Sequence, residues 1–331
     1  MNSPVRRRRF IAITAAALGM PLLPVVRGDA GATSQLRVWR GAALGADAVL
    51  QIHHPDPAVA DQLILRSLAE VARLERVFSL YREDSALVRL NREGRLDDPP
   101  LDLVRLLGEA ERFSALTDGA FDVTVQPLWD VYAAHFARSD ADPSGPPDEA
   151  IADALSRTGH AGVSFDERQA RLRPGMEITL NGIAQGYVTD RVVDLLRASG
   201  IEHALVDMGE TRAIGGHPMG GPWSAGLEDP ANPGQVAERI ALLDRAVATS
   251  GGYGTQFDAA GRFNHIFDPG DGSPSWRYLS VSVVAATATM ADALSTAFTL
   301  MPLERTAPVV RALGLSAHFA MRDGSRILQT S

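Results

Sequence analysis

The chain has 331 residues, of which 45% are hydrophobic and 22% charged, as in globular proteins rather than disordered or fibrous ones. Its formal net charge of −8 makes nucleic acid an improbable general partner. All 32 basic residues are arginine and cysteine is absent, which excludes lysine Schiff bases, P-loop lysines, disulfides, iron–sulfur clusters and cysteine nucleophiles.

Residues 1–32 have the pattern of an export signal. Arg6–Arg9 precede an apolar, alanine-rich run over residues 11–26, and Ala30-x-Ala32 fits a signal-peptidase site. A retained membrane anchor is the alternative, but the run contains two prolines and is shorter than the ~20 residues that a span needs. We therefore predict a cleaved signal, followed by a domain over residues 33–331.

The leader also predicts a route. Arg7-Arg8-x-Phe10-Ile11 resembles a twin-arginine signal, which exports proteins that are already folded. We expect the mature protein to be periplasmic and not membrane-spanning.

The hydrophobic pattern predicts a single α+β domain. Strands are expected at 36–52, 161–165, 170–180, 203–208, 237–243, 279–286 and 316–321. Helices are expected at 57–80, 101–116, 148–157, 186–200, 289–300 and 303–313. These elements alternate without a regular βαβ rhythm, which favours an α+β fold over a doubly wound sheet.

Two segments in the first half combine turn residues with aromatic ones. Residues 78–91 (Phe-Ser-Leu-Tyr-Arg-Glu-Asp-Ser to Leu-Asn) can be a helix end that runs into a capped second helix. Residues 117–128 (Thr-Asp-Gly-Ala-Phe-Asp-Val-Thr-Val-Gln-Pro-Leu) can be a turn before an alternating strand. Their small residues would also let a planar ligand approach the backbone closely.

A third segment, residues 179–187 (Thr-Leu-Asn-Gly-Ile-Ala-Gln-Gly-Tyr), is a glycine-bounded loop between a predicted strand and a predicted helix. Backbone N–H groups at a helix N-terminus bind phosphate readily. The spacing matches neither GxGxxG nor a Walker loop, so an ordinary strand–helix turn remains the alternative.

The fourth segment group comprises residues 248–253, 264–269 and 291–297. On a helix, Asp292 and Thr296 share one face, and a carboxylate beside a hydroxyl suits Mg²⁺. The structural alternative is a helix-dipole aspartate with a threonine that bonds back to a carbonyl. A histidine in a loop, such as His265, is either a hydrogen-bonded structural residue or an acceptor for a hydroxyl proton.

Taken together and in order, these blocks resemble the ApbE family of FAD:protein FMN transferases. The blocks are Phe-Ser-x-Tyr-x-x-Asp-Ser, Asp-Gly-Ala-Phe-Asp-Val-Thr, Gly-Ile-Ala-x-Gly-Tyr, Ala-Thr-Ser-Gly, His-Ile-x-Asp-Pro and Ala-Asp-Ala-Leu-x-Thr-Ala. The resemblance covers about residues 36–313 and implies an ApbE-like domain related to the T-fold.

The resemblance implies a reaction and a set of site residues. FAD is bound with Mg²⁺, a threonine or serine hydroxyl of a target protein attacks the FMN phosphorus, and AMP leaves. By motif position, the metal would be held by Asp292, Thr296 and the carbonyl of Gly182, while His265 would assist deprotonation of the hydroxyl. The positions that would contact FAD are Tyr81, Ala120, Phe121, Asp122, Thr179, Gln185 and Ile266.

Three positions depart from the family pattern. Thr179 stands where the loop usually begins with Asp, Gln185 replaces the usual Lys or Glu, and Ser295 lies where some members carry an additional acidic ligand. The loop string and the leader resemble the NosX branch, which implies a NosR-like membrane flavoprotein as target and a role in nitrous-oxide reductase maturation. A general flavinyltransferase for other redox complexes and a non-catalytic FAD carrier are the alternatives.

Overall fold

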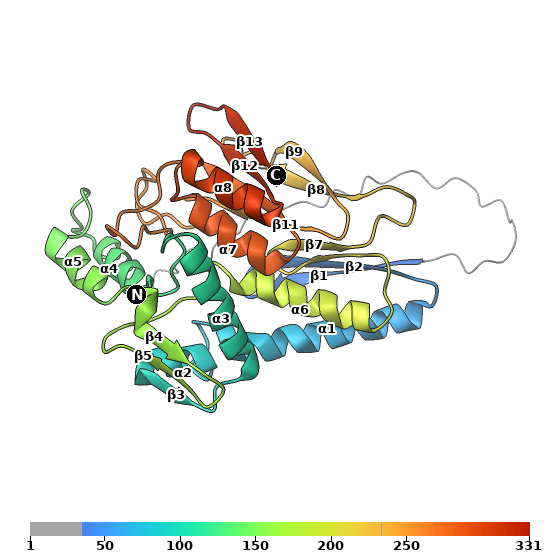
Figure 1. Ribbon diagram of the computed structural model, residues 1–331, viewed down its shortest axis with the longest axis horizontal. Coiled ribbons are helices and arrows are strands. Elements are labelled where there is room, and N and C mark those ends of the chain that lie inside the picture. The colour runs from blue at the N-terminus through green and yellow to red at the C-terminus, as the bar shows by residue number, and fades with distance from the viewer. Residues whose placement is uncertain (1–34, 233) are drawn as a thin grey trace, which may run out of the picture.

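The computed structural model describes residues 35–232 and 234–331, so the predicted leader at residues 1–32 lies outside the described residues. Its centre is an eight-stranded antiparallel sheet in the order β1-β2-β6-β7-β10-β11-β12-β13 (Figure 1). These strands are β1 (Gln35–Ala43), β2 (Ala46–His54), β6 (Ala204–Asp207), β7 (Thr211–Ile214), β10 (Ala246–Ser250), β11 (Ser280–Ala285), β12 (Ser316–Ala320) and β13 (Arg326–Thr330).

Helices cover one face of this sheet and a strand pair covers the other. The helices are α1 (Pro57–Phe78), α6 (Ala184–Ala198), α7 (Ala288–Phe298) and, beside β13, α8 (Leu303–Leu313). On the opposite face lie β8 (Trp223–Glu228) and β9 (Val236–Leu242). Alternation along the strands supplies both layers: Val206 joins the helix-side core, and its neighbour Leu205 joins the core under the β8–β9 pair.

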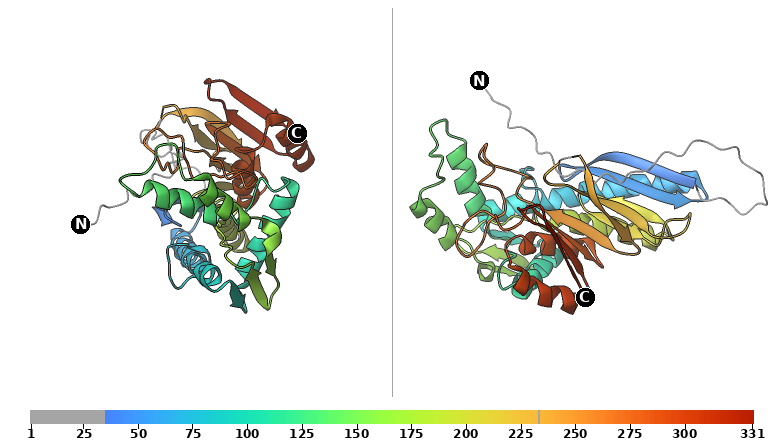
Figure 2. Two further views of the ribbon diagram at one scale, coloured as in Figure 1. Left: turned by 90° about the vertical axis from the view of Figure 1, so that its left-hand side faces the viewer. Right: turned by 90° about the horizontal axis from the view of Figure 1, so that it is seen from above.

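A second group of short elements extends the helical side. It comprises α2 (Ala86–Glu93), β3 (Arg95–Asp97), α3 (Leu101–Leu116), α4 (Gln126–Phe136), α5 (Asp148–Ser156), the 3₁₀ turn His160–Gly162, β4 (Val163–Phe165) and β5 (Gln169–Leu172). The strands β3, β5 and β4 form a small separate sheet. Helices α4 and α5 lie at the opposite end of the molecule from the start of β1 and the connection between β2 and α1 (Figures 1 and 2). Within the described residues, no helix has the length and apolar content needed to cross a membrane.

The α+β prediction is confirmed, but several predicted boundaries are wrong. The predicted strand 170–180 ends at Leu172. A turn follows at residues 174–175, and residues 176–180 belong to no strand. The strand interpretation of 117–128 also fails, because these residues form a turn and then enter α4 at Gln126. Pro127 lies in the first turn of α4, where its missing N–H costs nothing, whereas a central strand would lose a ladder bond.

The pattern also missed five strands, β3, β7, β8, β10 and β13. Three of them are short, since β3, β7 and β10 have three, four and five residues, and β13 is an edge strand in which three of five residues are polar or charged. Pairing with neighbouring strands, rather than a local hydrophobic signal, makes these segments strands.

Candidate active site

One pocket collects the predicted site residues from segments that lie far apart in the sequence. Its wall is formed by the turn at 117–125, the start of α6, the entrance to β7, the end of β10, the loop at 251–267, and α7. The predicted residues that line it are Ala120, Phe121, Asp122, Thr179, Gly182, Gln185, His265, Ile266, Asp292 and Thr296.

Tyr81 is the predicted contact that lies elsewhere. It is 68% exposed in the segment between α1 and α2, and it lines a neighbouring hollow. Gln126, Trp129 and Asn181 line both the pocket and this hollow. The two spaces are therefore contiguous, and Tyr81 belongs to the outer one.

The turn at 117–125 presents backbone to the pocket because its side chains hold it in shape. Thr117 Oγ1 accepts a hydrogen bond from Phe121 N, while Asp118 and Gly119 adopt positive φ. The carboxylate of Asp122 accepts bonds from Thr124 N and Oγ1 and from His160 N, at 2.6 to 2.9 Å. The Asp122 side chain is thus engaged in forming the turn, so a ligand would meet the backbone of this segment.

The loop before α6 uses much of its own hydrogen-bonding capacity. Ile183 N and Ala184 N both donate to Leu180 O, and Gly186 N donates to Asp292 Oδ2 at 2.9 Å. The expectation of a phosphate cradle built from free N–H groups at this helix N-terminus is therefore not met at these positions. A carboxylate of the protein already occupies Gly186, as the positive end of the helix dipole favours.

Helices α6 and α7 meet at very short range beside the pocket. A Cβ on Gly186 would lie 2.3 Å from Ala288 O, and a Cβ on Gly182 would lie 3.1 Å from Thr296 Oγ1. Glycine at these two positions lets the helices approach until Gly182, Asp292 and Thr296 line one wall of the pocket. The three residues that the sequence assigned to a metal therefore do come together.

The hydroxyl groups beside Asp292 form a connected set. Ser250 Oγ lies 2.7 Å from Ser295 Oγ and 3.1 Å from Thr296 Oγ1, and Ser295 Oγ also donates to Asp292 O. Thr296 therefore contacts the hydroxyl of Ser250 on β10 and not a carbonyl of its own helix. The alternative in which this threonine bonds back to a helix carbonyl is not what the structure shows. Ser295 is fully buried and engaged with Ser250 and Asp292.

Two buried carboxylates give this wall its electrostatic character. Burial raises the pKa of Asp292 to about 7, against the hydrogen bond from Gly186 N, and the nearby Asp190 adds to the increase. Burial also raises the pKa of Glu210 well above its usual range, with further contributions from Asp292 and Asp207. Glu210 was not among the predicted site residues; its only sequence signal is an acidic residue between two apolar strand segments.

His265 lies in the loop between β10 and β11, on the side of the pocket formed by residues 251–267. Its Nδ1 is 3.2 Å from Thr255 O, and its backbone N donates to the same carbonyl. Because a carbonyl only accepts, Nδ1 carries the proton of this bond in the neutral form of the ring. Gly254 packs against the imidazole, since a Cβ there would lie 3.1 Å from Cε1.

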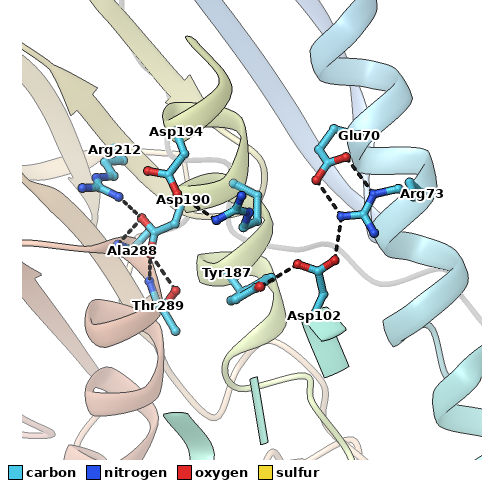
Figure 3. A network of polar contacts seen from close by, with 10 residues as sticks. Glu70, Arg73, Asp102, Tyr187, Asp190, Asp194, Arg212, Ala288 and Thr289 are labelled. Carbon is cyan, nitrogen blue, oxygen red and sulfur yellow. Dashed lines mark hydrogen bonds and ion pairs between the residues drawn. The ribbon is translucent and has the colours of Figure 1, made fainter. Parts of the chain in front are cut away.

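Two buried polar networks fix α6, and with it the pocket wall (Figure 3). On one side, Tyr187 donates to Asp102, which pairs with Arg73 at 2.7 Å. On the other, Asp190 accepts from Arg212 and from the first turn of α7, where Thr289 N and Oγ1 donate to it. The first network ties α6 to α1 and α3, and the second ties it to β7 and α7.

The fold and the pocket together define an α+β protein with one composite site, and comparison with known proteins gives its family. The sequence model of the ApbE family matches residues 44–319. A curated FAD:protein FMN transferase from Vibrio cholerae is 35% identical over 268 residues, covering 77% of this chain and 79% of that protein. One from Treponema pallidum is 30% identical over 324 residues, covering 89% and 88%.

Solved structures agree with this assignment. The ApbE protein from Thermotoga maritima superimposes with a TM-score of 0.77 at 30% identity, covering 89% of this chain and 97% of that one. The apo flavinyl transferase ApbE from Pseudomonas stutzeri gives a TM-score of 0.75 at 27% identity, covering 90% and 96%. This chain belongs to the ApbE family.

Proposed function

We propose that this chain is an FAD:protein FMN transferase that uses Mg²⁺ and acts on a threonine or serine hydroxyl of a target flavoprotein. The hydroxyl oxygen forms a bond to the FMN phosphorus, the bond from that phosphorus to the AMP oxygen breaks, and AMP leaves. The observation that carries the proposal is the pocket that joins the flavin, metal and histidine positions predicted from sequence. Names of relatives at 29–35% identity support the same activity.

The residues present fit a hard divalent cation. Asp292 and Thr296 offer a carboxylate and a hydroxyl beside the backbone of Gly182, and Mg²⁺ prefers such oxygen ligands. Within the described residues, no group of three or more His, Cys, Asp or Glu side chains is arranged for a metal. Most of the remaining ligands would therefore be carbonyl, hydroxyl and water oxygens, with room for at most one further carboxylate. The cation would supply charge neutralisation at the pyrophosphate.

The chain's own groups would perform the other steps. His265 Nε2 accepts the proton of the target hydroxyl, since Nδ1 is engaged with Thr255 O. Backbone at 120–122, together with Thr179, Gln185 and Ile266, forms the surface available to FAD. Tyr81, in the contiguous outer hollow, would meet an exposed end of FAD or the target. Positioning of the two reactants is the main task in phosphoryl transfer.

The target and the compartment are part of the same proposal. The Arg7-Arg8 leader supports twin-arginine export to the periplasm, and the loop string at 180–190 supports the NosX branch with a NosR-like target. A general flavinyltransferase for other membrane redox complexes shares all site features. A non-catalytic FAD carrier is the second class, favoured by the Thr179, Gln185 and Ser295 departures.

A reconstitution with purified chain, FAD, Mg²⁺ and a NosR-like target domain tests the proposal. We expect release of AMP and an increase of the target mass by one FMN. Replacement of the acceptor threonine or serine by alanine should abolish the mass increase. FAD binding without AMP release would establish the carrier instead, and transfer to an unrelated redox domain at equal rate would establish the general enzyme.

Asp292→Asn provides the matched test of the metal within that assay. We expect transfer to fall below 1% of the original rate (by ~10²-fold or more), because removal of a charged ligand acts on transition-state charge as well as on affinity. The amide still has an oxygen to accept from Gly186 N, so the variant should fold. Full activity of Asp292→Asn at ordinary Mg²⁺ concentrations would reduce this residue to a helix-capping role.

A further inference from the structure

We infer that Glu210 is the second carboxylate of the divalent cation site, together with Asp292; this inference rests on the proposed function. Glu210 directly precedes β7, lines the pocket and is 6% exposed. Glu210 is therefore buried at the pocket as a metal ligand would be. It lies at the start of β7, whereas Asp292 and Thr296 lie on α7.

One oxygen of Glu210 has a structural partner and the other has none. The ladder between β7 and β10 ends at the pair Thr211–Val247, and the N–H of Thr249 turns to the Glu210 carboxylate instead. Oε2 is buried without a hydrogen-bond partner among the described residues. The bond from Thr249 N accounts for one oxygen of Glu210 only. Leaving the other carboxylate oxygen buried without a partner costs free energy, which favours a bound ligand at this position.

The charges at this wall are also unbalanced. Glu210 and Asp292 are both buried and both line the pocket, yet neither forms an ion pair with a described residue. The nearby Arg212 pairs with Asp190, and the whole sequence contains no lysine. Buried charges in proteins are paired or coordinate metals, and two carboxylates match the charge of one divalent cation.

Helix α7 offers a single carboxylate to the pocket. Its sequence contains one acidic residue, Asp292, and the hydroxyl of Ser295 is engaged with Ser250 and Asp292 O. A second negative charge on α7 is thus absent, and Glu210 supplies one from the start of β7.

Metal binding by the full mature chain tests this without turnover. We would titrate Mn²⁺ into the protein, with and without FAD, and follow free Mn²⁺ by its electron paramagnetic resonance signal. Glu210→Gln keeps the size and can still accept from Thr249 N, and we expect it to weaken Mn²⁺ binding at least ~10-fold, as removal of a charged ligand should. If both carboxylates hold one ion, the Glu210→Gln and Asp292→Asn losses should not add in the double variant.

Asp207→Asn is the matched control. Asp207 is a buried carboxylate three residues away, it accepts from Gly209 N and Thr211 Oγ1, and it does not line the pocket. A change of less than ~3-fold is expected for it, since it acts only through longer-range electrostatics. If Glu210→Gln does not fold, Glu210→Asp retracts the carboxylate by one methylene and should lose affinity in the same way.

The outcomes separate this inference from the proposed function. Wild-type affinity in Glu210→Gln or Glu210→Asp, with loss in Asp292→Asn, would overturn the role of Glu210 and leave the transferase intact. Equal losses in Glu210→Gln and Asp207→Asn would reduce the effect to general electrostatics and also overturn it. Absence of Mn²⁺ binding by the unmodified chain with FAD would overturn the metal dependence itself.

Discussion

His265 lines the pocket, and one nitrogen of its imidazole forms a hydrogen bond with the backbone carbonyl of Thr255. We expect His265→Ala to lower single-turnover transfer by ~10²–10⁴-fold, the usual contribution of a general base. FAD affinity should change little, because other segments form most of the pocket wall. Both quantities can be measured on one preparation, by rapid quench for AMP and by flavin fluorescence for binding.

His135→Ala is a suitable control, since His135 lies on α4 outside the pocket and its Nε2 lies 2.8 Å from Asp142 O. It should leave both quantities unchanged. A His265→Ala variant that loses FAD affinity and thermal stability together, without a selective loss of turnover at saturating FAD, would show a structural residue.

The buried carboxylate of Asp207 predicts a pH dependence of stability. Burial raises its pKa from the usual 3.8 to about 6, although Gly209 N and Thr211 donate to it. Between these values the unfolded chain is ionised while the folded chain holds the proton, so the free energy of unfolding decreases as pH rises. The contribution of Asp207 to the free energy of unfolding amounts to ~3 kcal/mol. It is fully present below about pH 4 and is lost as the pH rises through about 6.

Asp207→Asn removes this titration and should flatten the curve. Urea unfolding at pH 4.5 and pH 7 should show a smaller loss of stability in the variant than in the unmodified chain, by ~2 kcal/mol. The other buried carboxylates are present in both proteins, and Glu210, whose pKa is raised in part by Asp207, would change the difference in the same direction. Parallel curves for the two proteins would mean that Asp207 titrates normally.

At the scale of elements, the contact between α6 and α7 positions Asp292, the proposed metal ligand, at the pocket wall. Gly186→Ala would bring a Cβ within 2.3 Å of Ala288 O, and backbone on both sides leaves little room to adjust. We expect a loss of stability of ~1–3 kcal/mol from overpacking, together with weaker divalent-cation binding as Asp292 is displaced. Chemical denaturation and Mn²⁺ titration measure the two effects.

Gly108→Ala in α3 provides the opposite case. The nearest atom to an added Cβ there is 3.9 Å away, on Phe165. Alanine should stabilise this helix interior by ~0.5–1 kcal/mol through the backbone entropy that glycine loses. Destabilisation by both substitutions to a similar extent would show that the α6–α7 contact is not unusually tight.

At the scale of the whole molecule, the proposed twin-arginine export can be tested separately from folding. Changing Arg7 and Arg8 together to lysine should leave unprocessed protein in the cytoplasm, because the twin-arginine route requires the arginine pair. These residues lie outside the described fold, so unfolding of the purified domain should not change. Cell fractionation with mass determination of the product checks both points, and normal periplasmic delivery of the double variant would contradict the route.

The sequence by itself determined the class of fold, most helices and the membership of the site. Long amphipathic periods predicted the helices that became α1, α3 and α8, because a helix of several turns repeats its apolar positions often enough to be recognised. The motifs also identified most of the residues that line the pocket, because their order along the chain carries the resemblance to the ApbE family.

Only the tertiary structure decided which of these residues meet. Short strands such as β7 and β10 carry little local signal and exist because distant segments pair with them. That pairing brings Glu210 to the pocket beside Asp292, eighty-two positions later in the chain, while Tyr81 is left in the outer hollow. Burial, and with it the charge balance of the site, depends on these long-range contacts, and a pattern of neighbours along the chain does not contain them.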